Sequence, residues 1–409
     1  MKITLIMLLL LGPAVEAVDW PTWRKDNNRS GVTTEQLTDA GLTQSWVFTE
    51  HSSPQAAWYG TMKRDAWANI SDPKDARAYD RAFNIIAADG KLFFASSSGN
   101  AAVALNAGSG TEIWRHTVEG SVRIAPTYDN DKLYFGSDDG RAYCVNADTG
   151  ASIWKYRGAP DAEMIPADNK FISKYPCRTG VLLQNGKAYC GFGLLPWKNN
   201  YLSSLDATTG SSTGLGHYSQ TIAAAEWYSF EGPMLATNDR LFILQGRVSP
   251  LVFTLSTGSL HGRLPGGGGT FAVITGNNLI HGPGHGNNTW AKDRIYHLQE
   301  SEGSTRTSVT RHSRAHRVLI NGSNRYYLIR NAVQATGGNS WVGTLHQPEC
   351  LIMGGTTLYV GSKNLVTAYN SASGTILRQL AVEGDVYGLA IADGKLFATT
   401  HAGKIYCFN

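Results

Sequence analysis

One segment of the chain occurs twice with little change. Residues 90–114 read GKLFFASSSGNAAVALNAGSGTEIW, and residues 131–154 read DKLYFGSDDGRAYCVNADTGASIW. In both copies apolar and polar residues alternate in short runs, and Gly, Asn or Asp separates the runs. This pattern is typical of antiparallel hairpins. The repeat therefore predicts consecutive β-strands joined by tight turns.

The same turn and strand recur along the chain, so that eight units can be counted. Their mean spacing is about 43 residues, the length of a four-stranded propeller blade. Abundant Gly (45 residues) and few charged residues (17%) also favour strands and turns over helices. We predict an all-β fold, an eight-bladed β-propeller of four-stranded antiparallel blades. After the two copies above, the units start at residues 185, 238, 276, 323, 355 and 393.

The two ends of the chain complement each other. The last unit stops at Asn409, directly after its third strand, and residues 43–49 form an isolated strand before the first unit. We predict that this N-terminal strand supplies the fourth strand of the last blade, which leaves no open sheet edge. The predicted domains are an N-terminal arm at 18–42 and a single propeller at 43–409, with a long insertion at 50–81.

The first 17 residues have the composition of a cleavable secretory signal peptide. Lys2 precedes an apolar run, and the small residues of Val-Glu-Ala lead to a cleavage site near Ala17. The expected location is periplasmic or extracellular, with no transmembrane segment after cleavage. Such a compartment permits disulfides, but the five cysteines are irregularly spaced, so their pairing stays open. A net charge of +4 without basic runs excludes a nucleic-acid partner.

Several motifs resemble exported bacterial β-propellers with PQQ-binding-like repeats. The Asn-Ala-x-x-Gly turns at 106–110 and 146–150, each followed by Trp, resemble the tryptophan-docking repeat of quinoprotein dehydrogenases and outer-membrane assembly lipoproteins. The N-terminal DWPTWR, with NRSG at 28–31, is similar to the first segment of the PQQ-binding-like group. The resemblance implies the propeller fold. It also raises pyrroloquinoline quinone (PQQ) with calcium as a cofactor.

The sequence also departs from that family. Quinoprotein dehydrogenases carry a vicinal disulfide, a covering insertion and a calcium site, whereas no two cysteines are adjacent here. No catalytic residue is therefore transferred to this chain. The docking tryptophan occurs in two units, Trp114 and Trp154, and Gly214 and Arg378 stand at the corresponding places in two others. We expect those two blades to dock less tightly.

The repeat register also predicts which residues line the central channel. The innermost strand of each blade faces the channel, and a mixed ring of guanidinium, imidazole, carboxylate and aromatic groups suits an anionic or sugar-like ligand. Alternatively, these groups neutralise one another across a wet channel. The candidate ligand-binding residues at the channel mouth are Arg123, Tyr175, Arg178, Glu231, His316, Arg317, His346 and Tyr387.

Three functions remain open from the sequence. The first is a binding scaffold, a monomer whose partner is a small molecule, a glycan or an envelope protein. The second is a PQQ-dependent oxidoreductase. The third is a polysaccharide-active enzyme such as a uronic-acid lyase, with His316 as base, Arg178 as charge neutraliser and Tyr175 as acid.

Two further segments have side chains that could serve a site. His281, His285 and His297 follow a strand in a Gly/Pro-rich stretch, where helical ligand spacing does not apply, and we expect no metal there. The insertion at 50–81 contains Trp58, Tyr59 and Trp67, which we expect to cover a channel mouth.

Overall fold

The computed structural model describes residues 18–38, 41–55, 82–167, 170–224, 227–246, 248–266, 268–283, 298–312 and 315–409. Within these residues the regular structure consists of β-strands, and no α-helix is present. None of the described residues forms a helix that could cross a membrane. The signal peptide predicted at 1–17 lies outside the described residues.

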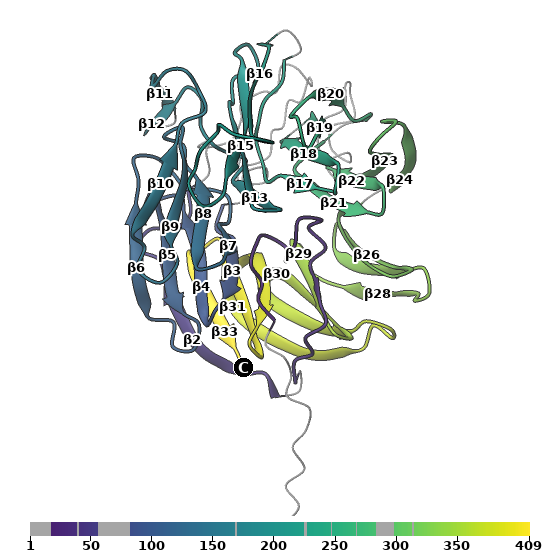
Figure 1. The fold of residues 1–409 in the computed structure, drawn as a ribbon. Coiled ribbons are helices and arrows are strands. Elements are labelled where there is room, and N and C mark those ends of the chain that lie inside the picture. Colours follow the sequence, from purple (N-terminus) through teal and green to yellow (C-terminus); the bar gives the residue numbers. More distant parts are fainter. Residues whose placement is uncertain are drawn as a thin grey trace, which may run out of the picture.

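Most strands belong to six antiparallel sheets of four strands, each hydrogen-bonded in sequence order. The sheets are arranged around a central channel, the architecture of a β-propeller (Figure 1). Their strands are β3 (Ile85–Ala88), β4 (Lys91–Ser96), β5 (Ala101–Asn106), β6 (Glu112–Thr117); β7 (Thr127–Asp129), β8 (Lys132–Gly136), β9 (Ala142–Asn146), β10 (Ser152–Tyr156); β13 (Val181–Gln184), β14 (Lys187–Phe192), β15 (Asn200–Asp206), β16 (Tyr218–Ile222); β17 (Leu235–Ala236), β18 (Arg240–Gln245), β19 (Val248–Thr254), β20 (Leu260–Arg263); β21 (Phe271–Thr275), β22 (Asn278–Gly282), β23 (Leu298–Glu302), β24 (Ser308–His312); β25 (Ala315–Asn321), β26 (Asn324–Ile329), β27 (Ala332–Thr336) and β28 (Trp341–Thr344).

The remaining strands form one seven-stranded sheet and one hairpin. The large sheet has the order β1-β29-β30-β31-β32-β33-β2, and the hairpin β11-β12 stands apart from the other sheets. Their bounds are β1 (Val32–Thr33), β2 (Gln44–Thr49), β11 (Met164–Ala167), β12 (Lys170–Ser173), β29 (Cys350–Gly354), β30 (Thr357–Asn370), β31 (Ile376–Ala392), β32 (Lys395–Thr400) and β33 (Lys404–Phe408).

The N-terminal strand β2 pairs with the last strand of the chain. β2 is antiparallel to β33, with Trp46 opposite Cys407 and Thr49 opposite Lys404. The sheet therefore joins residues about 360 positions apart in the sequence, and its last edge is provided by the beginning of the chain.

Tight turns connect each innermost strand to the next one. Asp89-Gly90 and Asp393-Gly394 adopt positive φ at both positions (50° and 67°; 51° and 71°). Type I′ hairpin turns require this conformation, and Asp-Gly adopts it at little cost. The sequence pattern therefore fixes the hairpins locally, before any packing between sheets.

Neighbouring sheets are joined by aromatic side chains that dock on glycine turns. The indole of Trp114 lies on Gly150 of the next sheet and donates from Nε1 to the Ala147 carbonyl at 2.9 Å. Trp154 lies in the same way on Gly210 and donates to Ala207. Each contact buries an aromatic surface and satisfies the indole N–H.

The expectation of only two docking tryptophans was wrong. Trp46 of β2 docks on Gly110, and Trp341 docks on Gly374 with Nε1 2.9 Å from the Ser371 carbonyl. Tyr218 covers Gly258 in the same manner. What fixes the docking residue is its position in the fourth strand of a sheet, and not the number of residues between it and the preceding glycine turn. A search by that number therefore misses Trp46, Trp341 and Tyr218.

The N-terminal arm, residues 18–42 without 39–40, lies in the channel at one end. Figure 1 shows it in dark purple beside β29 and β30. It contacts the innermost strand of all six four-stranded sheets and of the seven-stranded sheet. Hydrogen bonds join it to Ala87 of β3, Tyr128 of β7, Leu183 of β13, Ala236 of β17, Ile274 of β21, Val318 of β25 and Met353 of β29.

Two buried arginines anchor this arm. Arg24 donates from Nε to the Arg29 carbonyl at 2.8 Å and from Nη1 to the Leu351 carbonyl at 3.1 Å. Arg29 donates from Nε and Nη2 to the Met234 carbonyl at 3.0 and 2.7 Å. The carbonyls compensate for the loss of water around the guanidiniums, so the arm is bound by specific bonds as well as by burial.

The five cysteines, all within the described residues, are free thiols. Burial raises the pKa of Cys144, Cys177 and Cys407 to about 12 each. Such thiols stay protonated and unreactive at neutral pH. Of the possibilities left open by the sequence, the structure has the unpaired one.

Gly150→Ala tests the docking contact. The new Cβ would lie 2.8 Å from the Trp114 ring at a residue with φ of 70°. We expect a loss of about 2–4 kcal/mol in unfolding free energy, from backbone strain plus displacement of the indole. Urea unfolding of the purified protein measures this loss.

Gly186→Ala is the matched control. Gly186 has φ of 72°, but nothing lies within 4 Å of an added Cβ. Only the loss of unfolding free energy from backbone strain, about 1 kcal/mol, should remain. Equal losses in the two variants would contradict a stabilising role for the docked tryptophan.

Candidate functional site

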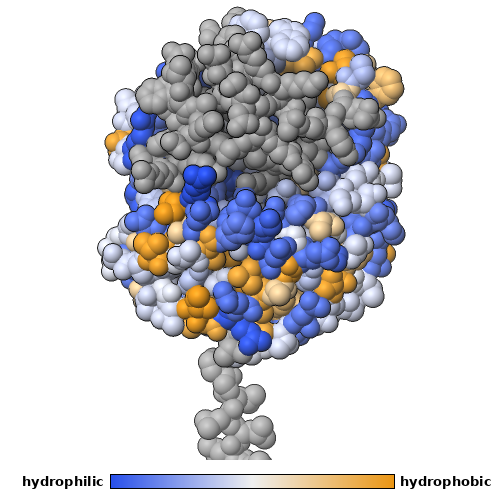
Figure 2. Space-filling view, turned by 180° about the vertical axis from the view of Figure 1, so that it is seen from behind, coloured by the Kyte–Doolittle hydropathy of each residue, from blue (hydrophilic) through white to orange (hydrophobic). Residues whose placement is uncertain are grey.

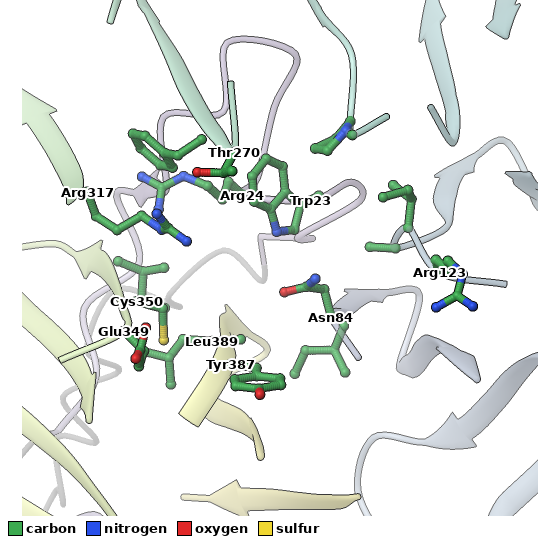
Figure 3. Close-up of a pocket in the computed structure, with 18 of the residues that line it drawn as sticks. Trp23, Arg24, Asn84, Arg123, Thr270, Arg317, Glu349, Cys350, Tyr387 and Leu389 are labelled. Carbon is green, nitrogen blue, oxygen red and sulfur yellow. The ribbon is translucent and has the colours of Figure 1, made fainter. Parts of the chain in front are cut away.

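A cavity lined by both polar and apolar residues occupies the channel beyond the arm. It has a volume of about 130 Å³, enough for several water molecules or a small ligand. Figure 3 shows Arg24 and Arg317 on one side of the cavity and Arg123 on the opposite side. The polar lining residues are Trp23, Arg24, Asn84, Arg123, Arg178, Glu231, Thr270, Arg317, Glu349 and Tyr387.

The cavity lies where the innermost strands begin, and the arm lies where they end. Arg123 precedes β7, Glu231 precedes β17 and Glu349 precedes β29, whereas the arm bonds Ala87 and Ala236 near the ends of β3 and β17. We call the side where these strands begin the open face and the opposite side the arm face. The arm obstructs the channel on the arm face and bounds the cavity there, because Trp23 and Arg24 belong to the cavity lining.

One wall of the cavity is an arginine pair held by a buried carboxylate. Asp138 is 1% exposed, and its Oδ2 accepts from Arg123 Nε at 2.7 Å. Arg178 donates to the same carboxylate from Nε at 2.7 Å and from Nη2 at 3.1 Å. Burial opposes ionisation, but the charges of Arg178 and then Arg123 outweigh it and hold the pKa of Asp138 below its ordinary value.

On the opposite wall two arginines flank one aromatic ring. The guanidinium carbon of Arg24 lies 5.1 Å from the centre of the Phe271 ring, and that of Arg317 lies 5.2 Å from it. Both distances are within the range of cation–π attraction. The Phe271 ring thus attracts two positively charged guanidiniums, those of Arg24 and Arg317.

Carboxylates and hydroxyls complete the lining. Glu231 Oε1 lies 3.7 Å from Arg178 Nη1, and its backbone N–H donates to the Leu244 carbonyl. Glu349, Tyr387 and Thr270 lie around the same cavity. The site therefore combines guanidinium donors, carboxylate acceptors, and hydroxyl groups that can both donate and accept hydrogen bonds.

The structure brings five of the eight predicted site residues to this cavity: Arg123, Arg178, Glu231, Arg317 and Tyr387. It places the other three elsewhere. Tyr175 is buried against Tyr201, with ring centres 5.2 Å apart. His316 is buried and donates from Nε2 to the Pro348 carbonyl, and His346 is exposed in the turn before β29. Of the three residues assigned to lyase chemistry, only Arg178 lines the cavity.

The sequence did not assign a site role to Trp23, Arg24 or Asp138. Asp138 stands where the first repeat copy has Ser97, and a charge that replaces a neutral residue within a repeat is a usable signal. Trp23 and Arg24 belong to the motif DWPTWR. This motif lies outside the repeat, so the repeat register does not show that it lies in the channel. Only the fold reveals that this motif reaches the cavity.

The residues present do not fit PQQ with calcium. All five thiols are free, and no group of three His, Cys, Asp or Glu side chains suited to a metal occurs within the described ranges. The arm itself places Trp23 and Arg24 in the channel. We therefore derive no chemistry through a quinone at this site.

The histidine segment is only partly described. His281 is buried in β22, where Nδ1 donates to the Gly268 carbonyl at 2.8 Å and burial lowers the pKa to about 4. This neutral imidazole is part of the core. His285 and His297 lie outside the described residues, as do Trp58, Tyr59 and Trp67 of the insertion. The described start of that insertion reaches the cavity edge, because the Gln55 carbonyl accepts from Arg123 Nη1 at 2.8 Å.

Comparison with known protein families identifies the family to which this chain belongs. The family model described as outer membrane protein assembly factor BamB matches residues 58–309, more than half of the sequence. The chain belongs to this family, within the superfamily of PQQ-repeat β-propellers.

Solved structures support the same fold. The crystal structure of BamB from Moraxella catarrhalis is 13% identical, with a TM-score of 0.56 over 90% of this chain and 99% of that one. The quinohemoprotein alcohol dehydrogenase from Comamonas testosteroni is 11% identical, with a TM-score of 0.64 over 96% of this chain and 80% of that one. At these identities the similarity concerns the fold alone.

One curated protein shares a short segment. Tetrathionate hydrolase from Acidithiobacillus ferrooxidans is 36% identical over 56 residues, which are 14% of this chain and 11% of that enzyme. Because so little of that enzyme is covered, the match transfers no activity to this chain.

Asp138→Asn tests the arginine pair and predicts a pH dependence. Loss of the carboxylate removes the buried counter-charge that Arg123 and Arg178 share, so we expect a loss of about 3–5 kcal/mol at neutral pH. Because the folded pKa of Asp138 is lowered, its contribution is complete above the unfolded pKa of about 3.9 and disappears as the pH falls through the folded pKa. The difference between wild type and variant should therefore shrink in acid.

Chemical denaturation at a series of pH values measures this difference. Asp148→Asn is the control, since Asp148 is exposed and its ion pair with Lys91 contributes about 0–1 kcal/mol. A loss for Asp138→Asn that is as small as the control's, or that does not depend on pH, would contradict the role assigned to the buried carboxylate.

Proposed function

We propose that this protein is an exported, eight-bladed propeller that acts as a binding scaffold and engages its partner at the open face. Export is supported by the composition of residues 1–17 and by membership of a family described as outer membrane protein assembly factor. A periplasmic location follows from these two indications. The proposed boundaries are a signal peptide at 1–17, an arm at 18–42 and a propeller at 43–409.

Eight blades follow from the sheets if the seven-stranded sheet is counted as two. Its strand β30, of 14 residues, pairs with β29 and with β31 and would supply two strands of one blade, whereas β31, of 17 residues, pairs with β30 and then with β32 and would pass from that blade into the next. The first would be β29 with the paired parts of β30 and β31, and the second β31-β32-β33-β2. The docking of Trp46 on Gly110 of the β3–β6 sheet supports a ring closed by the N-terminal strand.

The observation that carries the scaffold function is the difference between the two faces. The arm face has the arm and tight turns such as Asp89-Gly90. The open face has the cavity, the β11-β12 hairpin and the long connections that follow β2, β14 and β16. Long connections on a rigid scaffold are where binding residues concentrate.

The connections of the open face also expose large apolar side chains. Trp197 is 57% exposed after β14, Trp227 is 60% exposed after β16, and Phe171 of the hairpin is 69% exposed. The loops of the two tryptophans are linked, since the Ala224 N–H donates to Asn199 Oδ1. In the view of Figure 2 the coloured surface intersperses hydrophobic with hydrophilic residues. Exposed aromatic residues on linked loops favour contact with another macromolecule.

A photo-crosslinking residue in place of Trp197 or Trp227 tests the proposal in the exported full chain. The turns at Asp148 and Thr208, exposed on the arm face, provide matched control positions. We expect one defined adduct from the open-face positions at stoichiometric yield, and none from the turns. The same products from both faces, or none from either, would contradict binding at the open face.

A further inference from the structure

The arm passes along the sheets from the first to the last. Its hydrogen bonds reach β3, β7, β13, β21 and β29 in turn and end at the turn between β31 and β32. The first of these bonds pair Trp20 with β3, and in the last one Glu35 accepts from the Gly394 N–H. The first and last positions are neighbours, because Thr399 Oγ1 of β32 donates to the Phe83 carbonyl, just before β3, at 2.7 Å. The beginning of the arm therefore lies near its end.

Glu35 is a buried carboxylate with one unused oxygen. Its side chain and backbone together are only 2% exposed, and Oε1 accepts from Gly394. Oε2 is buried and has no hydrogen-bond partner in the part of the chain that the structure describes. The Val18 backbone N–H is close enough to lower the pKa of this carboxyl. A buried carboxylate in this state costs free energy unless a further donor or a cation reaches it.

The charged groups around Glu35 do not remove this cost. Burial raises the pKa of the Glu35 carboxyl, although the nearby backbone N–H groups and the charge of Lys25 act in the opposite direction. Lys25 Nζ donates to the Asp19 carbonyl instead of to Glu35. The titratable groups that act on Glu35 and on Lys25 are Asp19 and Asp26 of the arm and Asp393 of the β31–β32 turn. All three are carboxylates and disfavour a further negative charge.

We propose that Val18 is the first residue of the exported protein and that its ammonium group binds the buried Glu35 carboxylate at Oε2. Cleavage after Ala17 fits the composition of the signal peptide. When a signal peptidase hydrolyses this bond, water adds its hydroxyl to the Ala17 carbonyl carbon and a proton to the Val18 nitrogen. The new carboxyl group then loses a proton and the new amino group gains one, because both are charged at neutral pH.

The backbone holds Val18 in place for this contact. Trp20, two residues further on, is fully buried and exchanges two backbone hydrogen bonds with Ala87, at 2.6 and 3.0 Å. Cleavage turns the single N–H of Val18 into three N–H donors that carry a full positive charge. The buried carboxylate thereby gains a counter-ion as well as a hydrogen bond. The ion pair joins the beginning of the arm to its end, so it locks the arm in the cleaved protein and not in the precursor.

The inference rests on the export that the proposed function includes, and the two can fail separately. N-terminal sequencing of the exported chain tests the cleavage site. The ion pair is tested in a chain that a fusion protease releases with Val18 first, which requires no export. The crosslinking at Trp197 and Trp227 does not depend on the ion pair. An open-face adduct without the ion pair would overturn this inference and leave the scaffold proposal standing.

NMR titration of the Val18 amino group in the mature full chain tests the ion pair. We expect the pKa of this group to lie above the ordinary α-amino value of about 8, because the charged form is stabilised by Glu35. Glu35→Gln keeps an oxygen for the Gly394 hydrogen bond but removes the charge, so it should bring the pKa back towards the ordinary value. At pH 7 an activated ester should then acetylate Val18 at least about tenfold faster in the variant than in the wild type.

Asp393→Asn is the matched control, since it removes a carboxylate from the same turn and leaves Glu35 in place. We expect it to change the titration and the acetylation of Val18 much less than Glu35→Gln does. A first residue other than Val18, an ordinary titration of Val18 in the wild type, or equal effects of the two variants would overturn the proposal.

A chain with two extra residues before Val18 tests the lock even if Glu35→Gln does not fold. It retains Glu35 but has an amide in place of the ammonium group. The mature chain should unfold at a higher urea concentration than the extended one at pH 7. Because the ion pair raises the pKa of the amino group, this difference is complete below about pH 8 and disappears as the pH rises through the raised value. Equal midpoints, or a difference that persists in alkali, would contradict the lock.

Discussion

The structure depends on the N-terminal arm, residues 18–42 without 39–40, which is bound inside a ring of strands. Two guanidiniums, those of Arg24 and Arg29, are buried and are stabilised by carbonyl groups of the arm and of the innermost strands. Burying a cation is costly unless its hydrogen bonds are made, so the arm fits only when the sheets are in place around it. Since the arm contacts the innermost strand of every large sheet, it also fixes where those strands lie relative to one another.

Besides the arm, docked tryptophans hold neighbouring sheets together. Trp114, Trp154 and Trp341 each cover a glycine of the following sheet and donate to a carbonyl beside it. Trp46 makes this contact between the seven-stranded sheet, which contains the C-terminal strands, and the β3–β6 sheet. The same interaction thus joins sheets that are adjacent in the sequence and sheets that only the fold brings together.

Local patterns were enough to predict much of the fold. The alternation and the Asp-Gly turns predicted the strands, and the missing strand after Phe408 predicted the pairing of β2 with β33. The site was predicted only in part, because register counting finds residues near the start of an innermost strand but not the direction of their side chains. His316 and Arg317 are adjacent, yet only Arg317 lines the cavity. Asp138 and Arg24 reach the site through long-range packing, which no local pattern contains.

We propose that the arm closes one face of the channel and leaves the other for binding, and this is the central claim of the account. Hydrogen–deuterium exchange of the mature protein tests it most directly, with the amides of Trp20 and Gly31 as reporters. These amides donate to the Ala87 and Arg24 carbonyls. The account predicts that they exchange as slowly as the amides of β3 and β29, since the arm opens only when the innermost strands separate. Exchange as fast as at the exposed turn residues Gly108 and Ser109 would contradict it, because the arm would then leave the channel while the sheets stay folded.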